Sequence, residues 1–177
     1  MHRRQPLPRL WLMTDERQGE GLWRALERLP RGSGIVFRHY SLDPRERKEL
    51  FLKVKRAARR RRLVVVLGGP PRLARSWRAD GSHGLYAHTP FEDVLRSAPA
   101  HDLKEIRAAE RFQADLLFVS PVFPTRSHPE ARPLGPVRFA LLARAARVPV
   151  IALGGMDERR ARRLAGAYGW AGIDAWT

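Results

Sequence analysis

The sequence predicts an α/β fold, a (β/α)8 barrel of the TIM type that lacks its last helix. Short β-rich segments alternate with amphipathic stretches, which is typical of parallel strands joined by crossover helices. The predicted strands number eight, as a barrel of this type requires. They cover residues 10–14, 34–38, 63–67, 84–87, 95–100, 116–119, 148–153 and 172–176.

The helices between these strands are predicted from capping residues and from apolar side chains at helical spacing. In three places an N-cap residue is followed three positions later by a glutamate. These starts are Asp43 with Pro44 and Glu46, Thr89 with Pro90 and Glu92, and Asp102 with Glu105. Apolar residues recur at helical spacing at Leu50, Phe51, Val54, Ala57 and Ala58, and again at Phe139, Leu142, Ala143 and Ala146. We expect both apolar faces to pack on the barrel.

The length of 177 residues fits one domain with a substantial core. We expect a flexible basic arm over residues 1–8 and a single barrel domain over residues 9–177. Because the last predicted strand ends at residue 176, we expect no eighth helix and a flexible carboxyl end. The oligomeric state is left open, and in a homo-oligomer a partner subunit would complete this end of the barrel.

The composition narrows the class of protein. Cysteine is absent, which excludes a disulfide framework, and the longest apolar run is residues 63–71, far shorter than the about 20 residues of a membrane span. We therefore expect a soluble, cytoplasmic protein without a membrane partner. The formal net charge is +16, but arginines occur on nearly every predicted helix. This even distribution favours solvated helix surfaces over the basic stripe of a nucleic-acid-binding protein.

One loop has an unusual composition. Residues 120–136 follow the sixth predicted strand and contain four prolines after Pro121. Loops that follow the strands of a barrel lie over its active face, so this loop indicates a functional site.

Three ordered motifs carry a resemblance to a known family. They are LLFVSPVFPT at residues 116–125, PLG at 133–135 and PVIALGGM at 149–156. Weaker matches are LMTD at 12–15, ADG at 79–81 and AGIDAWT at 171–177. Together these segments extend over nearly the whole chain, and they resemble thiamine-phosphate synthase and the related thiazole tautomerase, both of which are barrels of this type.

The resemblance implies a transferase of thiamine biosynthesis. In the implied reaction, hydroxymethylpyrimidine pyrophosphate loses pyrophosphate, and the nitrogen of a thiazole phosphate captures the resulting cation. These two phosphorylated small molecules are the implied partners. A synthase would also use Mg²⁺, which binds carboxylate oxygens and neutralises the developing pyrophosphate.

The resemblance also implies a site at the ends of the strands. The implied catalytic residues are Arg38 on the second strand and Thr125 after the sixth, and we add His101 as a candidate because it stands at the carboxyl end of the fifth strand. In the substrate loop Ser127 can supply a hydroxyl donor of the family, and His128 stands at the position of a lysine. The implied phosphate-binding residues are Gly154, Gly155 and Thr177. Glycines after the seventh strand with a polar residue after the eighth are typical of a barrel phosphate site.

Several positions depart from the synthase pattern. The Asn-Asp pair that follows the third strand in the family falls on Gly68 and Gly69, and a second metal-binding Asp falls near His88. We therefore assign no residue as a metal ligand. Tyr40 replaces a lysine and Pro99 replaces a serine.

Three functions stay open. An active synthase would need another carboxylate near the pyrophosphate, such as Asp15, Glu16 or Asp43. A metal-independent isomerase like the thiazole tautomerase would need a new proton carrier, because the histidine of that branch is Pro121 here; His101 is the best placed for this role. The third alternative is a barrel that binds a phosphorylated ligand but has lost catalysis.

Overall fold

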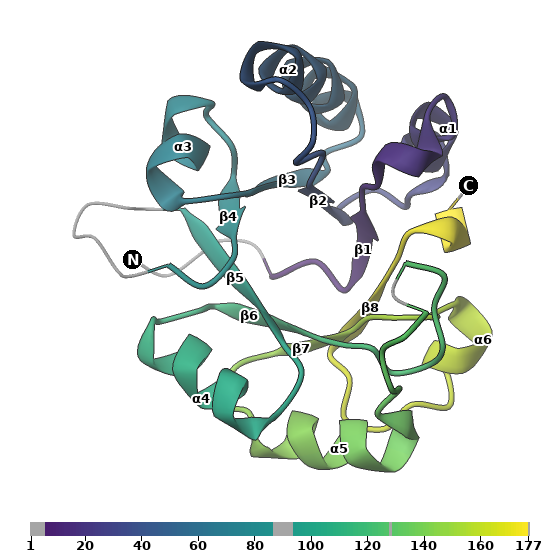
Figure 1. Ribbon diagram of the computed structural model, residues 1–177. Coiled ribbons are helices and arrows are strands. Elements are labelled where there is room, and N and C mark those ends of the chain that lie inside the picture. The colour runs from purple at the N-terminus through teal and green to yellow at the C-terminus, as the bar shows by residue number, and fades with distance from the viewer. Residues whose placement is uncertain (1–5, 87–93, 128, 177) are drawn as a thin grey trace.

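The computed structural model describes residues 6–86, 94–127 and 129–176, which form a closed barrel of eight parallel strands (Figure 1). Each strand pairs with the next one along the chain, and β8 pairs with β1. The strands are β1 (Leu10–Met13), β2 (Gly34–Phe37), β3 (Val64–Gly68), β4 (Gly81–His83), β5 (Leu95–Ala100), β6 (Leu116–Val119), β7 (Val150–Ala152) and β8 (Gly169–Gly172). The predicted (β/α)8 fold is therefore confirmed.

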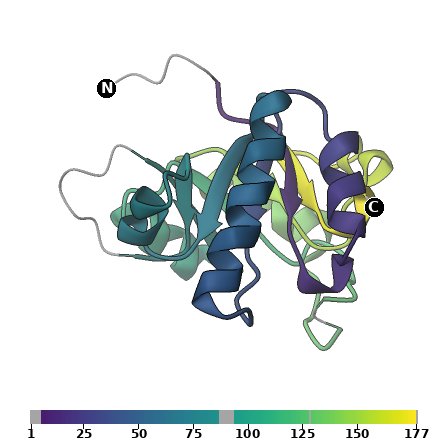
Figure 2. The same cartoon turned by 90° about the horizontal axis from the view of Figure 1, so that it is seen from above.

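Helices surround the barrel, and Figure 2 shows the long α2 lying along its outside. They are η1 (Glu16–Gln18), α1 (Gly21–Arg28), α2 (Pro44–Arg60), α3 (Pro71–Ser76), α4 (Leu103–Arg111), α5 (Gly135–Ala145), α6 (Glu158–Ala161) and η2 (Asp174–Trp176), where η marks a 3-10 turn. Two predicted N-caps are confirmed: Asp43 accepts a hydrogen bond from the backbone N–H of Arg45, and Asp102 from that of Glu105. The third predicted start, Thr89 with Pro90 and Glu92, lies outside the described residues.

Six of the predicted strands agree with the structure to within two residues, but the fourth was placed too late. β4 is Gly81–His83, not 84–87. Its start is fixed by Asp80, whose side chain accepts from the backbone N–H of Val65 at 2.8 Å and whose carbonyl accepts from that of Leu95 at 3.0 Å. Gly81 fits because a Cβ there would lie 2.7 Å from the Cβ of Leu95. The residues that suggested a strand, Leu85 and Tyr86, are exposed.

The eighth predicted strand, 172–176, was also placed too late. β8 is Gly169–Gly172, a glycine-containing segment with low intrinsic strand propensity. The residues after it form the turn η2, in which Trp176 stacks on Trp170 with ring centroids 4.8 Å apart. The indole N–H of Trp176 donates to the carbonyl of Trp11 at 3.0 Å. A single anchored turn therefore follows the last strand.

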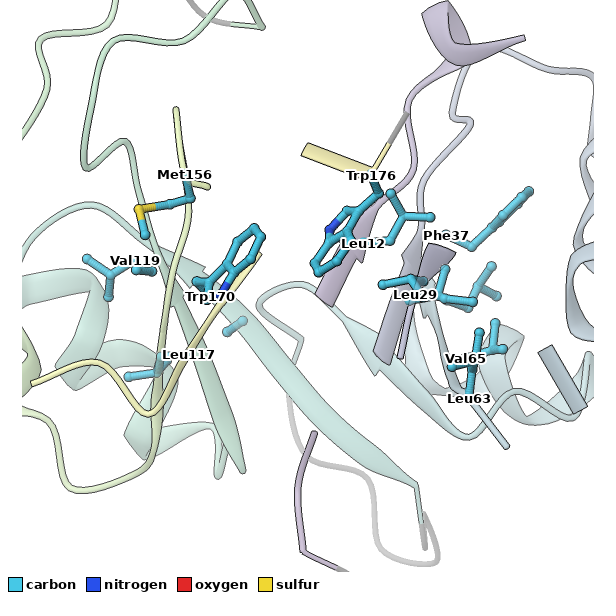
Figure 3. Close-up of a cluster of buried hydrophobic side chains, with 14 of the residues drawn as sticks. Leu12, Leu29, Phe37, Leu63, Val65, Leu117, Val119, Met156, Trp170 and Trp176 are labelled. Carbon is cyan, nitrogen blue, oxygen red and sulfur yellow. The ribbon is translucent and has the colours of Figure 1, made fainter. Parts of the chain in front are cut away.

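Two groups of apolar side chains stabilise the fold. One fills the barrel itself and includes Trp11 and Phe118, whose rings meet edge to face at 5.3 Å. The other lies between the strands and the surrounding helices, and Figure 3 shows part of it. These side chains fill the interior of the barrel, and three hollows lie at the carboxyl ends of its strands. No helix in the described part of the chain is long and apolar enough to cross a membrane.

Candidate active site at the carboxyl ends of the strands

Three adjoining hollows lie where the strands end. The central pocket has a volume of about 260 Å³ and is lined by Met13, Arg38, Tyr40, His83, Pro99, His101, Ser120, Pro121, Thr125, Ser127, Ala131, Leu153, Gly154 and Ile173. The glycine cup, of about 150 Å³, is formed by residues 124–127, 153–156 and 171–175. The outer pocket, of about 420 Å³, is formed by residues 14–17, 38–40 and 126–127.

The three hollows form one groove because they share lining residues. The central pocket and the glycine cup share Thr125, Ser127, Leu153, Gly154 and Ile173. The central and outer pockets share Arg38, Tyr40 and Ser127. A ligand, or two ligands side by side, can therefore extend from the end of β8 to the end of β2.

Most of the sequence-predicted residues reach this groove. Those that line the central pocket are Arg38, His101, Thr125, Ser127 and Gly154, and Gly155 lines the glycine cup. His88, His128 and Thr177 lie outside the described residues.

His101 lies at the rim of the central pocket. Its side chain is 56% exposed, and its Nδ1 lies 2.7 Å from Oε2 of Glu105 on α4. The backbone N–H of His101 donates to the same oxygen. The glutamate therefore holds the imidazole at the edge of the groove.

The substrate loop after β6 is tied to the first strand. The hydroxyl of Ser127 accepts a hydrogen bond from Nη2 of Arg17 at 2.8 Å. Arg17 in turn donates to Asp15 through Nε at 2.7 Å and through Nη2 at 3.1 Å. This chain of contacts places a guanidinium between the loop and the outer pocket.

Sequence analysis missed His83, the most buried polar group of the central pocket. Its Nδ1 lies 3.0 Å from the hydroxyl of Ser97, and that hydroxyl lies 3.2 Å from the carbonyl of Ser82, to which it donates. The Ser97 hydroxyl therefore accepts from the Nδ1–H of His83, which leaves Nε2 as a hydrogen-bond acceptor.

Burial, together with the positive charge of Arg38, lowers the pKa of His83 to about 4. The imidazole is neutral at neutral pH. The sequence could have revealed His83 if the fourth strand had been placed at Gly81–His83, because the last residue of a barrel strand lies at the carboxyl end, where the site is formed.

Arg38 supplies the positive charge between the central and outer pockets. Its Nε donates to the carbonyl of Thr14 at 2.7 Å, and its Nη2 donates to Oδ2 of Asp15 at 3.1 Å. Burial lowers the pKa of Arg38, and Asp15 acts in the opposite direction; an arginine nevertheless stays charged in a protein. The hydrogen bond from Arg17 holds the pKa of Asp15 below its usual value, so this carboxylate is ionised. Asp15 is thus already paired with two cations.

The end of β3 does not provide the ligands of a magnesium ion. Gly68 and Gly69 have no side-chain oxygen, and a Cβ added at Gly68 would overlap the hydroxyl of Tyr40. The carbonyls of Arg38 and Gly68 are occupied by hydrogen bonds from the guanidinium of Arg47 at 2.6–3.0 Å. Among the described residues, no group of three or more His, Cys, Asp or Glu side chains could hold a metal ion. The described residues at this end of the barrel therefore do not provide a set of ligands for Mg²⁺.

The glycine cup is built from backbone. Gly154 and Gly155 have φ of 94° and 59°, in the left-handed region that favours glycine. A Cβ on Gly154 would lie 2.7 Å from the Cα of Pro121, so the absence of a side chain lets the β6 loop pack on the end of β7. Within the described chain the N–H groups of Gly154 and Gly155 have no acceptor, so both can donate to a ligand.

The other wall of the cup contains a carboxylate. Because β8 ends at Gly172, the residues after it that line the cup are Ile173, Asp174 and Ala175. Oδ2 of Asp174 lies 3.0 Å from Nη2 of Arg126 on the β6 loop. The ion pair closes one side of the cup.

A family model, related sequences and a solved structure are all similar to this chain over most of its length. The model of the family described as thiamine monophosphate synthase matches residues 10–176. A protein of Aquifex aeolicus that is provisionally named thiamine-phosphate synthase 2 is 33% identical over 179 residues, covering 94% of this chain and 96% of the relative. The thiamine-phosphate synthase of Methanobrevibacter smithii is 25% identical over 166 residues, covering 88% and 79%. The structure of thiamine phosphate pyrophosphorylase from Pyrococcus furiosus superposes with a TM-score of 0.78 at 26% identity, covering 96% of this chain and 86% of the other.

Proposed function

The chain belongs to the thiamine monophosphate synthase family, and from this premise we propose that it condenses hydroxymethylpyrimidine pyrophosphate with thiazole phosphate. The observation that carries the proposal is the single groove that joins the glycine cup, the central pocket and the outer pocket. Two substrates with phosphate groups at their far ends fit a groove with a phosphate cup at one end and guanidinium groups at the other. The two small molecules are the partners in this proposal, and a cytoplasmic location belongs to it as well.

In this proposal the thiazole phosphate lies at the β7 and β8 end. Its phosphate accepts hydrogen bonds from the N–H groups of Gly154 and Gly155, and its ring lies against the apolar side chains of Leu153 and Ile173. Thr125 offers a hydroxyl where the cup meets the central pocket.

The pyrimidine lies in the central pocket beside His83. The neutral imidazole presents Nε2 as an acceptor, which suits an amino group on the ring. The pyrophosphate then points toward Arg38 and the outer pocket. The arrangement brings the methylene carbon of the pyrimidine near the nitrogen of the thiazole.

The reaction breaks the bond between that carbon and the pyrophosphate oxygen, which keeps the electron pair. The lone pair of the thiazole nitrogen forms the new carbon–nitrogen bond. Arg38 stabilises the negative charge on the departing oxygen, because a fixed cation in a partly buried site acts without reorganisation. Since the described residues do not fit Mg²⁺, no step is assigned to a metal ion.

A second candidate is a metal-independent isomerase of a thiazole phosphate. The observation that favours it is the neutral, buried His83, a base that needs no metal. It differs from the first candidate because it needs the cup and the central pocket but not Arg38.

The test is calorimetric titration with thiazole phosphate, followed by an assay for thiamine phosphate with both substrates. We expect binding, product formation and a large fall in turnover for Arg38→Gln. Arg28→Gln, an exposed arginine on α1, is the matched control and should keep full turnover. Binding of thiazole phosphate without thiamine phosphate, together with isomerised thiazole, would favour the isomerase. Absence of thiazole phosphate binding contradicts both functions.

A further inference from the structure

A guanidinium lies at the point where the ends of β2 and β3 meet. Arg47 comes from the first half of α2, and its side chain folds back onto the barrel. Its Nε and Nη2 donate to the carbonyl of Arg38 at 3.0 and 2.8 Å, and its Nη2 donates to the carbonyl of Gly68 at 2.6 Å. Carbonyl oxygens that would otherwise attract a cation from solution are thus occupied by a cation of the chain itself.

Aromatic rings hold this guanidinium in place. Its central carbon lies 5.1 Å from the ring centroid of Tyr40, 5.6 Å from that of Trp77 and 5.9 Å from that of Phe37. Such contacts favour a cation that is only partly hydrated, as a guanidinium is. The position of Arg47 is therefore fixed by rings as well as by hydrogen bonds.

Tyr40 connects Arg47 with the pockets. Its ring lies over the guanidinium, its hydroxyl lies against Gly68, and it lines both the central and the outer pocket. Desolvation raises the pKa of Tyr40, while Arg38 and Arg47 act to lower it. The phenol therefore stays protonated at neutral pH and can donate a hydrogen bond to an anion.

The nearby carboxylates already have partners in the protein. Asp15 is paired with Arg17 and Arg38. Glu16 accepts hydrogen bonds from the backbone N–H and the hydroxyl of Ser41. The end of the groove thus combines fixed cations with carboxylates that already have partners.

We propose that Arg38, Tyr40 and Arg47 bind a diphosphate group without Mg²⁺. Arg38 and Tyr40 contact the diphosphate, and Arg47 is a positioning residue that holds Tyr40 and adds a fixed positive charge behind it. The ligand class is a diphosphate ester or inorganic pyrophosphate. The inference deepens the proposed function and rests on it for the identity of the ester.

The experiment is calorimetric titration of the full chain with inorganic pyrophosphate, once in EDTA and once in Mg²⁺, with the free pyrophosphate concentration calculated in the second case. We expect the two dissociation constants to agree within about twofold and Arg47→Met to weaken binding about tenfold. Arg47→Lys keeps the charge but not the fork, so it should recover part of the loss. The matched control is Arg45→Gln, an exposed arginine two residues away on α2, which should bind as the wild type does.

Thiazole phosphate provides the second readout for the same variants. If Arg47→Met only disturbed the fold, it would also weaken thiazole phosphate binding in the glycine cup, whose lining does not include Arg47, whereas the proposal expects that binding to stay unchanged. Pyrophosphate binding that needs Mg²⁺, no pyrophosphate binding in either buffer, or wild-type binding by Arg47→Met would overturn the inference. Metal-free pyrophosphate binding without formation of thiamine phosphate would support this inference and contradict the proposed synthase.

Discussion

The buried imidazole of His83 predicts a specific loss of stability in mild acid. Its pKa is lowered to about 4 by burial and by Arg38, from an ordinary value of 6.5. Below pH 6.5 the unfolded chain takes up a proton at this site and the folded chain does not, so the free energy of unfolding falls as the pH falls. Because one pKa unit corresponds to about 1.4 kcal/mol, the loss between pH 7 and pH 5 is roughly 2 kcal/mol, and it reaches roughly 3 kcal/mol near pH 4.

The perturbation that isolates this effect is His83→Asn. The asparagine amide can donate to the Ser97 hydroxyl as Nδ1–H does, but it does not titrate. Urea unfolding at several pH values between 7 and 4 should show a smaller decline for the variant than for the wild type, by the amounts given above. If His83→Asn retains the wild-type decline, the imidazole is not held neutral in the folded state.

Three further predictions concern the cup and the helices. Asp174→Ser removes a carboxylate from the wall of the proposed phosphate cup and releases Arg126 to pair with the phosphate. Calorimetry should therefore show thiazole phosphate binding about three- to tenfold more tightly. Unchanged or weaker binding would place the phosphate elsewhere. Gly155→Ala should lower the free energy of unfolding by about 2 kcal/mol or more, because its Cβ would meet the backbone of the β6 loop. Gly32 also has a positive φ but lies in open surroundings, so Gly32→Ala should lower that free energy by only about 1 kcal/mol. Equal losses in the two variants would contradict the packing argument. Asp102→Ala removes the N-cap of α4 and should cost about 1 kcal/mol in urea unfolding, and no loss would mean that water replaces the cap.

The fold was predictable because its signals are local. Strand β6 is an apolar run bounded by Asp115 and by Ser120 with Pro121, and its predicted limits match the structure, as do those of β5. The limits of β4 and β8 depend on glycines that allow close packing with a neighbouring strand, as Gly81 does with Leu95 and Gly169 with the backbone of Arg9. Such a contact joins segments far apart along the chain, and no local pattern indicates it.

The site was predictable only in part, for the same reason. Residues that follow a strand, such as Arg38 and Thr125, must lie at the carboxyl end of a parallel barrel, and the structure places both in the central pocket. His83 was missed because its strand was predicted three residues too late. Arg47 was missed because it lies on a helix face, where an arginine is normally solvated, and its contacts with two strand ends exist only in the closed fold.

Three features at this end of the barrel depend on one another, namely the glycine at position 68, the ring of Tyr40 and the guanidinium of Arg47. The hydroxyl of Tyr40 lies where the Cβ of a residue at position 68 would be, so a side chain there and the tyrosine cannot keep these positions together. The ring of Tyr40 in turn lies over Arg47, whose guanidinium occupies the carbonyls of Arg38 and Gly68. A side chain added at position 68 would meet the tyrosine hydroxyl, whereas a Cβ at position 69, on which the Asp of the family pair falls, would contact only Leu73. A side chain at position 68 therefore requires Tyr40 to move, and moving Tyr40 removes one of the rings that hold Arg47.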